Sequence, residues 1–238
     1  MIKRGQVPDG RPTIAEWPVK IRKPEEVPQP FEKQVCGWIR GDFSEYEFVY
    51  SPRRRTNPDS FAYLYGYGKG QILFLREETE ESDSGTISRI ELPRQQVTEV
   101  QTTRELLNAE IILLYQEGEE RKRLTLPYVP STYYLYDPFL NWILGLERDF
   151  MPSVAEREHP RPEKLYQESL AMFNYSLAAY RLGKGFQEYT YRSEWHRKKW
   201  MPWKKTLEEW LQVPMERGEF ELHSLGYLTE CFYRIGKK

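Results

Sequence analysis

The hydrophobic positions between Phe61 and Leu126 recur at every second residue or in short apolar runs, a pattern typical of β-strands. It predicts a hairpin over Phe61–Glu78 and further strands over Thr86–Leu92, Gln96–Thr103, Asn108–Tyr115 and Arg121–Leu126. Glycines mark the turn of the first hairpin, and Gly118 lies in the turn between the last two strands. No segment of helical length interrupts the series, so we expect a mainly antiparallel sheet.

The period of the pattern changes after Tyr133. Asp137 suits a helix N-cap, and Pro138 suits the first helical position. Apolar residues then follow at helical spacing, at Phe139, Trp142, Ile143 and Leu146. The sequence therefore predicts a short amphipathic helix that covers an apolar surface of the preceding sheet.

The first 30 residues are rich in proline, which fixes φ and removes a backbone donor. We therefore expect neither a helix nor a sheet interior in this arm. Trp17, Val19 and Ile21 leave two alternatives open, a disordered leader or an extended arm packed on the body. From residue 31 the apolar positions become denser, and the alternation up to Tyr50 predicts a half-buried strand.

The last third of the chain follows a proline-containing linker over Met151–Pro162. The apolar residues of Glu163–Leu182 recur at helical spacing and predict one long helix. Its apolar face packs either in the core of the chain or in an interface between two copies. A second short helix is predicted over Thr206–Leu211, and two strands joined near Gly226 end the chain. We expect an α+β protein with an arm (1–30), a β domain with its closing helix (31–147) and a helical appendage (148–238).

Composition adds little to this picture. Lys plus Arg (35) nearly balances Asp plus Glu (36), so attraction to an anionic partner must come from local clusters. There is no apolar run long enough to span a membrane, and the first residues do not form a secretory signal. Cys36 and Cys231 are far apart in the sequence and form no Cys-x-x-Cys motif, which favours a reducing cytoplasm. A single disulfide between them remains an alternative.

Taken together, these strands and the closing helix resemble a bacterial pleckstrin-homology-like domain covering about residues 46–147. The resemblance rests on the order of the strands, the bend at Pro93, the turn at Gly118 and the helix Pro138–Leu146. It implies a bent sheet or barrel capped by a C-terminal helix, and a role in protein interaction or assembly. Relatives that bind lipid headgroups use basic residues in an early loop, where this chain offers only Lys69.

Two basic clusters are candidate binding sites. Arg53, Arg54 and Arg55 lie in a proline-bounded loop and form either an anion-binding loop or a solvated one. The second cluster interleaves tryptophans with basic residues, at Trp195, Arg197, Lys198, Lys199, Trp200, Trp203, Lys204 and Lys205. Such a segment can bind an anionic surface, or its tryptophans can anchor the appendage to the sheet. The direction in which the tryptophans point discriminates between these two interpretations.

No spacing of histidine, cysteine or carboxylate residues predicts a metal site, a cofactor or a nucleophile with its base. The first hypothesis is therefore a non-enzymatic cytoplasmic module that binds a protein partner or itself. The alternative is a peripheral binder of an anionic membrane or nucleic acid, although the balanced charge argues against nucleic acid. An enzyme with a site between sheet and appendage is a third hypothesis.

Overall fold

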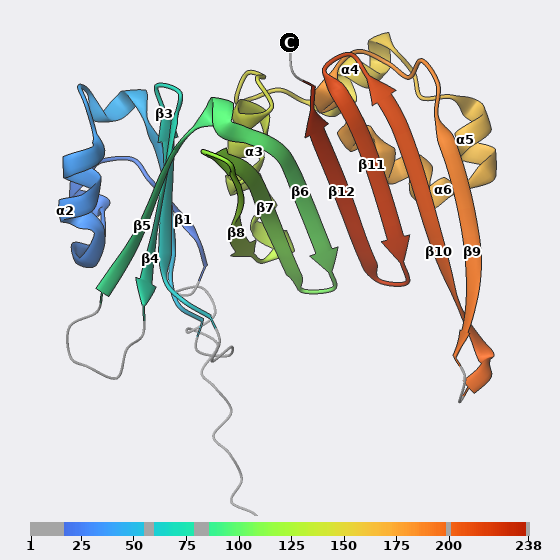
Figure 1. Cartoon of the computed structure of the whole chain (residues 1–238), viewed down its shortest axis with the longest axis horizontal. Helices are drawn as coiled ribbons and strands as arrows, with labels where there is room; N and C mark the ends of the chain where they lie inside the picture. Colours follow the sequence, from blue (N-terminus) through green and yellow to red (C-terminus); the bar gives the residue numbers. More distant parts are fainter. Residues whose placement is uncertain (1–16, 55–59, 79–85, 199–200, 237–238) are drawn as a thin grey trace, which may run out of the picture. The chain divides into compact units, whose positions relative to one another are not determined.

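The structure is a computed structural model that describes residues 17–54, 60–78, 86–198 and 201–236. The chain divides into two compact units, Met1–Arg94 and Gln95–Lys238. Each unit contains one antiparallel sheet, and neither sheet is closed into a barrel (Figure 1). The protein is thus α+β, as the strand pattern predicts. The expected single bent sheet or barrel is replaced by two sheets.

The sheet of the first unit has five strands in the order β1-β2-β3-β4-β5, with every neighbouring pair antiparallel. The strands are β1 (Val19–Ile21), β2 (Glu47–Ser51), β3 (Tyr63–Gly68), β4 (Gln71–Glu78) and β5 (Thr86–Pro93). The predicted hairpin over Phe61–Glu78 is confirmed as β3 and β4. Its two-residue turn has positive φ at Lys69 (47°) and Gly70 (74°), the conformation that glycine favours.

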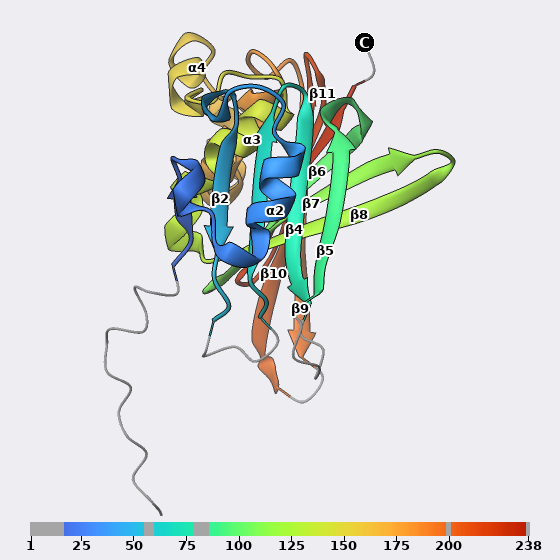
Figure 2. The same ribbon diagram turned by 90° about the vertical axis from the view of Figure 1, so that its left-hand side faces the viewer.

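A helix that the sequence pattern did not predict covers this first sheet (Figure 2). It is α2 (Gln29–Trp38), and the short turns η1 (Pro24–Glu26) and η2 (Phe43–Glu45) flank it. Phe31, Val35 and Trp38 are buried at helical spacing against Phe48 and Leu64. Pro30 does not prevent the helix, because proline is tolerated in a first helical turn.

The described part of the proline-rich arm is ordered and packs on the body, which is one of the two alternatives left open by the sequence. Its strand β1 lies at the sheet edge, in agreement with the expectation of no sheet interior, but the expectation of no helix is wrong because α2 begins at Gln29. Val19 pairs with Tyr50 and Ile21 with Phe48, so β1 extends the sheet at its edge. Ile21 and Val27 belong to the buried core of this unit. The prolines lie at strand ends and helix starts, where no backbone donor is required. Residues 1–16 lie outside the described residues.

The second unit contains seven strands in the order β8-β7-β6-β12-β11-β10-β9, again all antiparallel. They are β6 (Val97–Glu105), β7 (Asn108–Glu117), β8 (Glu120–Tyr128), β9 (Thr190–Lys198), β10 (Met201–Met215), β11 (Gly218–Leu225) and β12 (Leu228–Ile235). β12 pairs with β6 from Leu228 to Arg234, so strands from both sides of residue 147 share one sheet. This pairing crosses the predicted boundary between a β domain (31–147) and an appendage (148–238), and the two compact units meet at Arg94 and Gln95 instead.

Helices cover one face of this sheet and lie behind it in the view of Figure 1. The helical segments of this cover are η4 (Pro130–Leu135), α3 (Asp137–Ile143), α4 (Pro152–Glu158), α5 (Glu163–Glu168), α6 (Leu170–Tyr175) and η5 (Ser176–Leu182), whereas η3 (Arg94–Gln96) is the short connection from β5 to β6. α3 confirms the predicted closing helix, with Phe139, Leu140 and Ile143 buried. Asp137 does not cap it, because its carboxylate pairs with Arg181 instead.

Two predicted helices in the last third differ from the structure. The helix over Glu163–Leu182 breaks at Ser169, which is extended (φ −157°, ψ 112°) and caps α6 by accepting a hydrogen bond from the Met172 amide. The helix over Thr206–Leu211 is wrong, since these residues lie within β10. Pairing with strands on both sides overrides the weak helical spacing there. The two terminal strands and their turn at Gly226 (φ 61°) are confirmed.

Candidate binding sites

The arginine loop belongs to the first unit. Ser60 closes this loop, accepting a hydrogen bond from the Arg54 amide at 2.8 Å and donating to the Arg54 carbonyl at 2.9 Å. Arg53 is exposed, Arg54 is half-buried, and Arg55 lies outside the described residues. The tryptophan-lysine segment belongs to the second unit, so the two predicted basic clusters do not share a compact unit.

The tryptophan-lysine segment is the end of the β9–β10 hairpin. β11 begins to pair with β10 only at Glu208, whereas β9 pairs with β10 beyond that point, at Leu207, Thr206 and Lys205. The hairpin therefore continues past its neighbouring strands as a two-stranded extension, at the lower right of Figure 1. We call this part, residues 195–198 and 201–207, the hairpin extension.

One face of the hairpin extension carries exposed aromatic and basic side chains. Trp195 lies opposite Leu207 and Arg197 opposite Lys205, so these four side chains share a face. Trp195 is 62% exposed, and Arg197 and Lys205 are exposed as well. This exposure favours Trp195 as part of a binding face over Trp195 as a buried anchor.

The remaining predicted residues of this cluster are only partly described. Lys204 is exposed. Lys199 and Trp200 lie outside the described residues, and so do the side chains of Lys198 and Trp203.

The face of the sheet opposite the helices holds a polar chain that sequence reasoning missed. His223 Nε2 lies 2.8 Å from Glu208 Oε1, and His223 Nδ1 lies 2.9 Å from Glu230 Oε2. His196 Nε2 lies 2.5 Å from the second oxygen of Glu208, and Gln101 donates to Glu230 at 3.2 Å. These residues come from five different strands, so no local spacing could have indicated them.

These contacts change the charge states along the chain. Burial lowers the pKa of His223, but the hydrogen bonds that its ring donates to Glu230 and Glu208 outweigh burial and leave the pKa raised. The hydrogen bond from His223 is the largest cause of the lowered pKa of Glu208. Both effects favour a protonated imidazole between two carboxylates.

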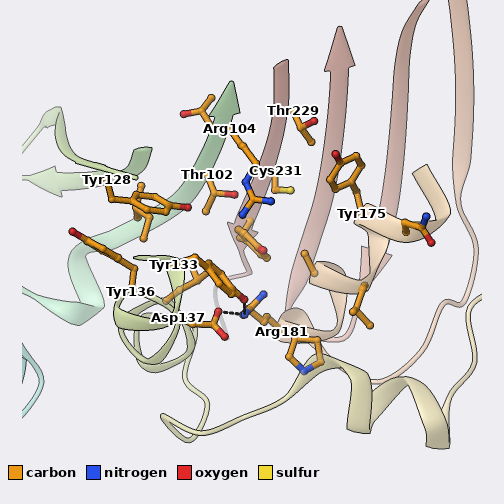
Figure 3. Close-up of a pocket in the computed structure, with 18 of the residues that line it drawn as sticks. Thr102, Arg104, Tyr128, Tyr133, Tyr136, Asp137, Tyr175, Arg181, Thr229 and Cys231 are labelled. Carbon is orange, nitrogen blue, oxygen red and sulfur yellow. Dashed lines mark hydrogen bonds and ion pairs between the residues drawn. The ribbon is translucent and has the colours of Figure 1, made fainter. Parts of the chain in front are cut away.

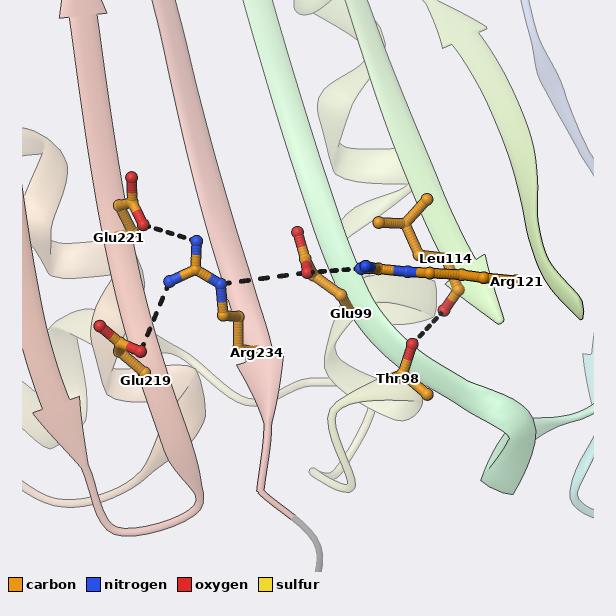
Figure 4. Close-up of polar contacts among 7 residues, drawn as sticks. All are labelled: Thr98, Glu99, Leu114, Arg121, Glu219, Glu221 and Arg234. Atoms are coloured by element: carbon orange, nitrogen blue, oxygen red, sulfur yellow. Dashed lines mark hydrogen bonds and ion pairs between the residues drawn. The ribbon is translucent and has the colours of Figure 1, made fainter. Parts of the chain in front are cut away.

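A second network on the same face joins Arg234 to three carboxylates (Figure 4). Its guanidinium lies 2.6 Å from Glu221, 3.4 Å from Glu219 and 4.0 Å from Glu99. Arg121 reaches the same Glu99 oxygen at 2.9 Å from β8. The charges on this face thus satisfy one another across strands, which leaves it a poor match for a charged ligand.

The covered face of the sheet contains a cavity of about 460 Å³ between the strands and the helices (Figure 3). Arg181 lies in its wall, 3% exposed, with its Nε donating to Asn141 Oδ1 at 2.8 Å. The Arg181 guanidinium also contacts Asp137 and donates to the Tyr133 hydroxyl at 3.2 Å. Arg104, Tyr128 and Cys231 line the cavity as well.

Burial raises the pKa of the Cys231 thiol to about 11, so it is a protonated side chain at neutral pH. Among the described residues there is no group of three His, Cys, Asp or Glu side chains that could hold a metal ion. The helices within the described ranges are all too short or too polar to cross a bilayer.

No family model, curated protein or solved structure matches this chain. The interpretation of these sites therefore rests on their geometry and chemistry alone.

Proposed function

We propose that this chain is a non-enzymatic interaction and assembly module, and that the edge strand β9 pairs with β9 of a second copy. One observation carries this proposal. β9 is an edge of the seven-stranded sheet, and its residues from Arg192 to Arg197 are exposed. An edge strand offers unpaired backbone donors and acceptors to another strand.

The side chains of β9 are complementary to themselves. In an antiparallel pair centred on Ser193, Arg192 of each copy lies opposite Glu194 of the other, and Tyr191 lies opposite Trp195. Opposite charges and aromatic pairs in directly facing positions stabilise antiparallel strands. The register thus gives two ion pairs and two aromatic pairs across one symmetric contact.

The other edge strand of the same sheet, β8, carries residues that disfavour such pairing. β8 carries three consecutive cations, Arg121, Lys122 and Arg123, and a proline at Pro127. Like charges repel a second copy, and proline removes a ladder donor. The contrast between the two edges favours β9 as the contact.

A charge-swap experiment on the full chain tests the contact. The expected result is a concentration-dependent dimer in sedimentation velocity. Arg192→Glu places two glutamates opposite each other and weakens dimerisation at least about tenfold. The double variant Arg192→Glu with Glu194→Arg restores the ion pairs and the dimer. Arg123→Glu on β8 is the matched control and leaves the dimer unchanged.

Two results would overturn the proposed contact. One is a chain that stays monomeric up to about millimolar concentration, where even weak specific contacts form. The other is a double variant as defective as Arg192→Glu alone, which would mean that Arg192 acts only through its stacking on Trp210.

The hairpin extension favours a second candidate function, binding to an anionic membrane surface. Its exposed Trp195 beside Arg197 and Lys205 combines an interfacial aromatic side chain with two cations. Vesicles containing phosphatidylserine should then bind the chain at low salt, and binding should weaken with added salt. Lys205→Glu should reduce binding and Arg123→Glu should not. No binding to these vesicles at low ionic strength removes this candidate.

The pleckstrin-homology-like resemblance forms part of the proposal as well. Its support is the order of elements, with strands β2 to β8 followed by α3. The pairing of β6 with β12 lies outside that resemblance. Cooperative unfolding of the fragment 31–147 would support an autonomous domain, and a fragment without a folded core would count against it. The two cysteines, free in the structure, support a place in a reducing cytoplasm.

A further inference from the structure

The cavity on the covered face of the second sheet has the size of a small-molecule site. Its volume of about 460 Å³ lies within the range of about 300–1,000 Å³ that such sites occupy. β6 and β12 form one wall, and α3, α6 and η5 contribute the other. All of these elements belong to one compact unit.

One side of the cavity is aromatic and apolar. Tyr128 and Tyr136 stack with their ring centroids 4.6 Å apart and their planes at 27°. Ile111 and Leu140 complete this side of the lining. A flat apolar group could lie against these rings and lose its contact with water.

The charges that line the cavity do not cancel. Its charged side chains are Arg104, Arg181 and Asp137, so two cations and one anion leave a net positive charge. Asp137 is the ion-pair partner of Arg181. In the described part of the chain, the Arg104 side chain makes neither an ion pair nor a hydrogen bond with another residue, although its backbone lies in the β6 ladders. Figure 3 shows its guanidinium beside Cys231 and Thr102, between Tyr128 and Tyr175.

We propose that this cavity binds a small molecule with an aromatic body and one carboxylate, which Arg104 pairs with at its mouth. Arg104 is exposed on the cavity rim, whereas Arg181 is fully engaged in the wall. A planar guanidinium suits a carboxylate because it can donate two parallel hydrogen bonds.

Neighbouring hydroxyl groups suit the same ligand. The Thr229 and Thr102 side chains line the cavity near Arg104. Burial raises the pKa of Tyr128 to about 12, so its phenol stays a neutral donor at neutral pH. Donors around a single unpaired cation select an anion over a neutral or cationic molecule of the same shape.

A matched pair of probes tests the proposal with the full chain. Indole-3-acetate carries the aromatic body and the carboxylate, and indole-3-acetamide is its neutral counterpart. Calorimetric titration should show binding of the acetate at least about tenfold tighter than that of the amide. The chain has 5 methionines, and Met151 lines this cavity, so its ε-methyl NMR signal should move on titration. The signal of Met172 should move less, because it does not line the cavity.

Variants at Arg104 test whether its guanidinium is the group that binds the carboxylate of the ligand. Arg104→Met keeps most of the aliphatic stem and should weaken acetate binding about tenfold, bringing it to the level of the amide. Arg104→Lys keeps the charge and should retain part of the preference. Arg123→Met, an equal loss of charge on an exposed strand, is the control and should bind as the unchanged protein does.

Three results would overturn the site. They are equal binding of acetate and amide, unchanged acetate binding by Arg104→Met, and no shift of the Met151 signal at millimolar acetate. None of them depends on dimerisation through β9, because Arg192→Glu should bind the acetate normally. The ligand site and the proposed assembly function can therefore fail separately.

Discussion

Arg181 Nε donates a hydrogen bond to Asn141 Oδ1 at 2.8 Å, and this contact joins η5 to α3 in the interior of the second unit. The Asn141 amide in turn donates to the carbonyls of Arg148 and Phe150, both at 3.0 Å. The pair thus connects the helical cover to the loop that follows α3. Both side chains are almost completely buried.

Replacing Arg181 should therefore cost more stability than replacing an exposed arginine. Arg181→Met leaves the Asp137 carboxylate without its cation, and losing one partner of a buried pair typically costs about 3–5 kcal/mol. We expect the free energy of unfolding in urea to fall by about 3 kcal/mol. The double variant Arg181→Met with Asp137→Asn should recover part of the loss, because no unpaired charge remains. A loss as small as that of Arg123→Met would contradict this role.

The stability that His223 contributes should depend on pH. Its pKa is raised in the folded state, because the hydrogen bonds that the ring donates to Glu230 and Glu208 outweigh burial. A raised folded pKa gives stability that is complete below the unfolded value of about 6.5 and is lost as the pH rises through the folded value. The difference in unfolding free energy between the unchanged protein and His223→Gln should therefore shrink as the pH rises above about 6.5.

NMR titration of the His223 ring provides an independent check. The midpoint should lie above about 6.5, and Glu230→Gln should lower it. Glu219 lies on β11, as His223 does, but pairs with Arg234, so Glu219→Gln should leave the midpoint unchanged. A midpoint below the ordinary value, or a stability difference that grows with pH, would show that burial prevails over the carboxylates.

Two glycine-to-alanine substitutions in the first unit should have opposite effects. A methyl group on Gly66 in β3 would overlap the fully buried Phe48 ring. Overpacking of this kind typically costs about 1–3 kcal/mol. Gly37 lies in α2 with nothing within 4 Å of an added methyl, and alanine in a helix stabilises by about 0.5–1 kcal/mol. Equal urea midpoints for the two variants would contradict the close approach of Phe48 to the β3 backbone.

The same glycine shows how far the sequence could predict the fold. Gly66, Gly68 and Gly70 indicated a turn, yet only Gly70 lies in it. Gly66 lies in a strand because Phe48 from β2 requires the space, a long-range contact that local chemistry does not reveal. The strands β3 to β8 were predicted because alternation and turn chemistry are local properties.

Pairings between distant segments account for the largest errors. The partner of β6 is β12, far along the chain, and their pairing places strands from both sides of residue 147 in one sheet. Thr206–Leu211 lie in a strand because β10 pairs with β9 and β11. The basic-aromatic cluster was recognisable from composition, but the extension that exposes Trp195 follows from unequal strand lengths. The His223 network and the Arg104 cavity are each formed by segments that are far apart in the sequence, so no local motif predicts them.

The two cysteines should react at different rates with a thiol reagent. Cys36 is exposed on α2, whereas burial raises the pKa of Cys231 to about 11. Since the thiolate is the reactive form, Cys231 should be nearly inert at about pH 8. Native protein should thus release one equivalent of chromophore quickly from Ellman's reagent, and a second only in denaturant. Cys36→Ser should remove the fast phase and Cys231→Ser should keep it. Failure of both thiols to react until a reductant is added would show that they are bridged.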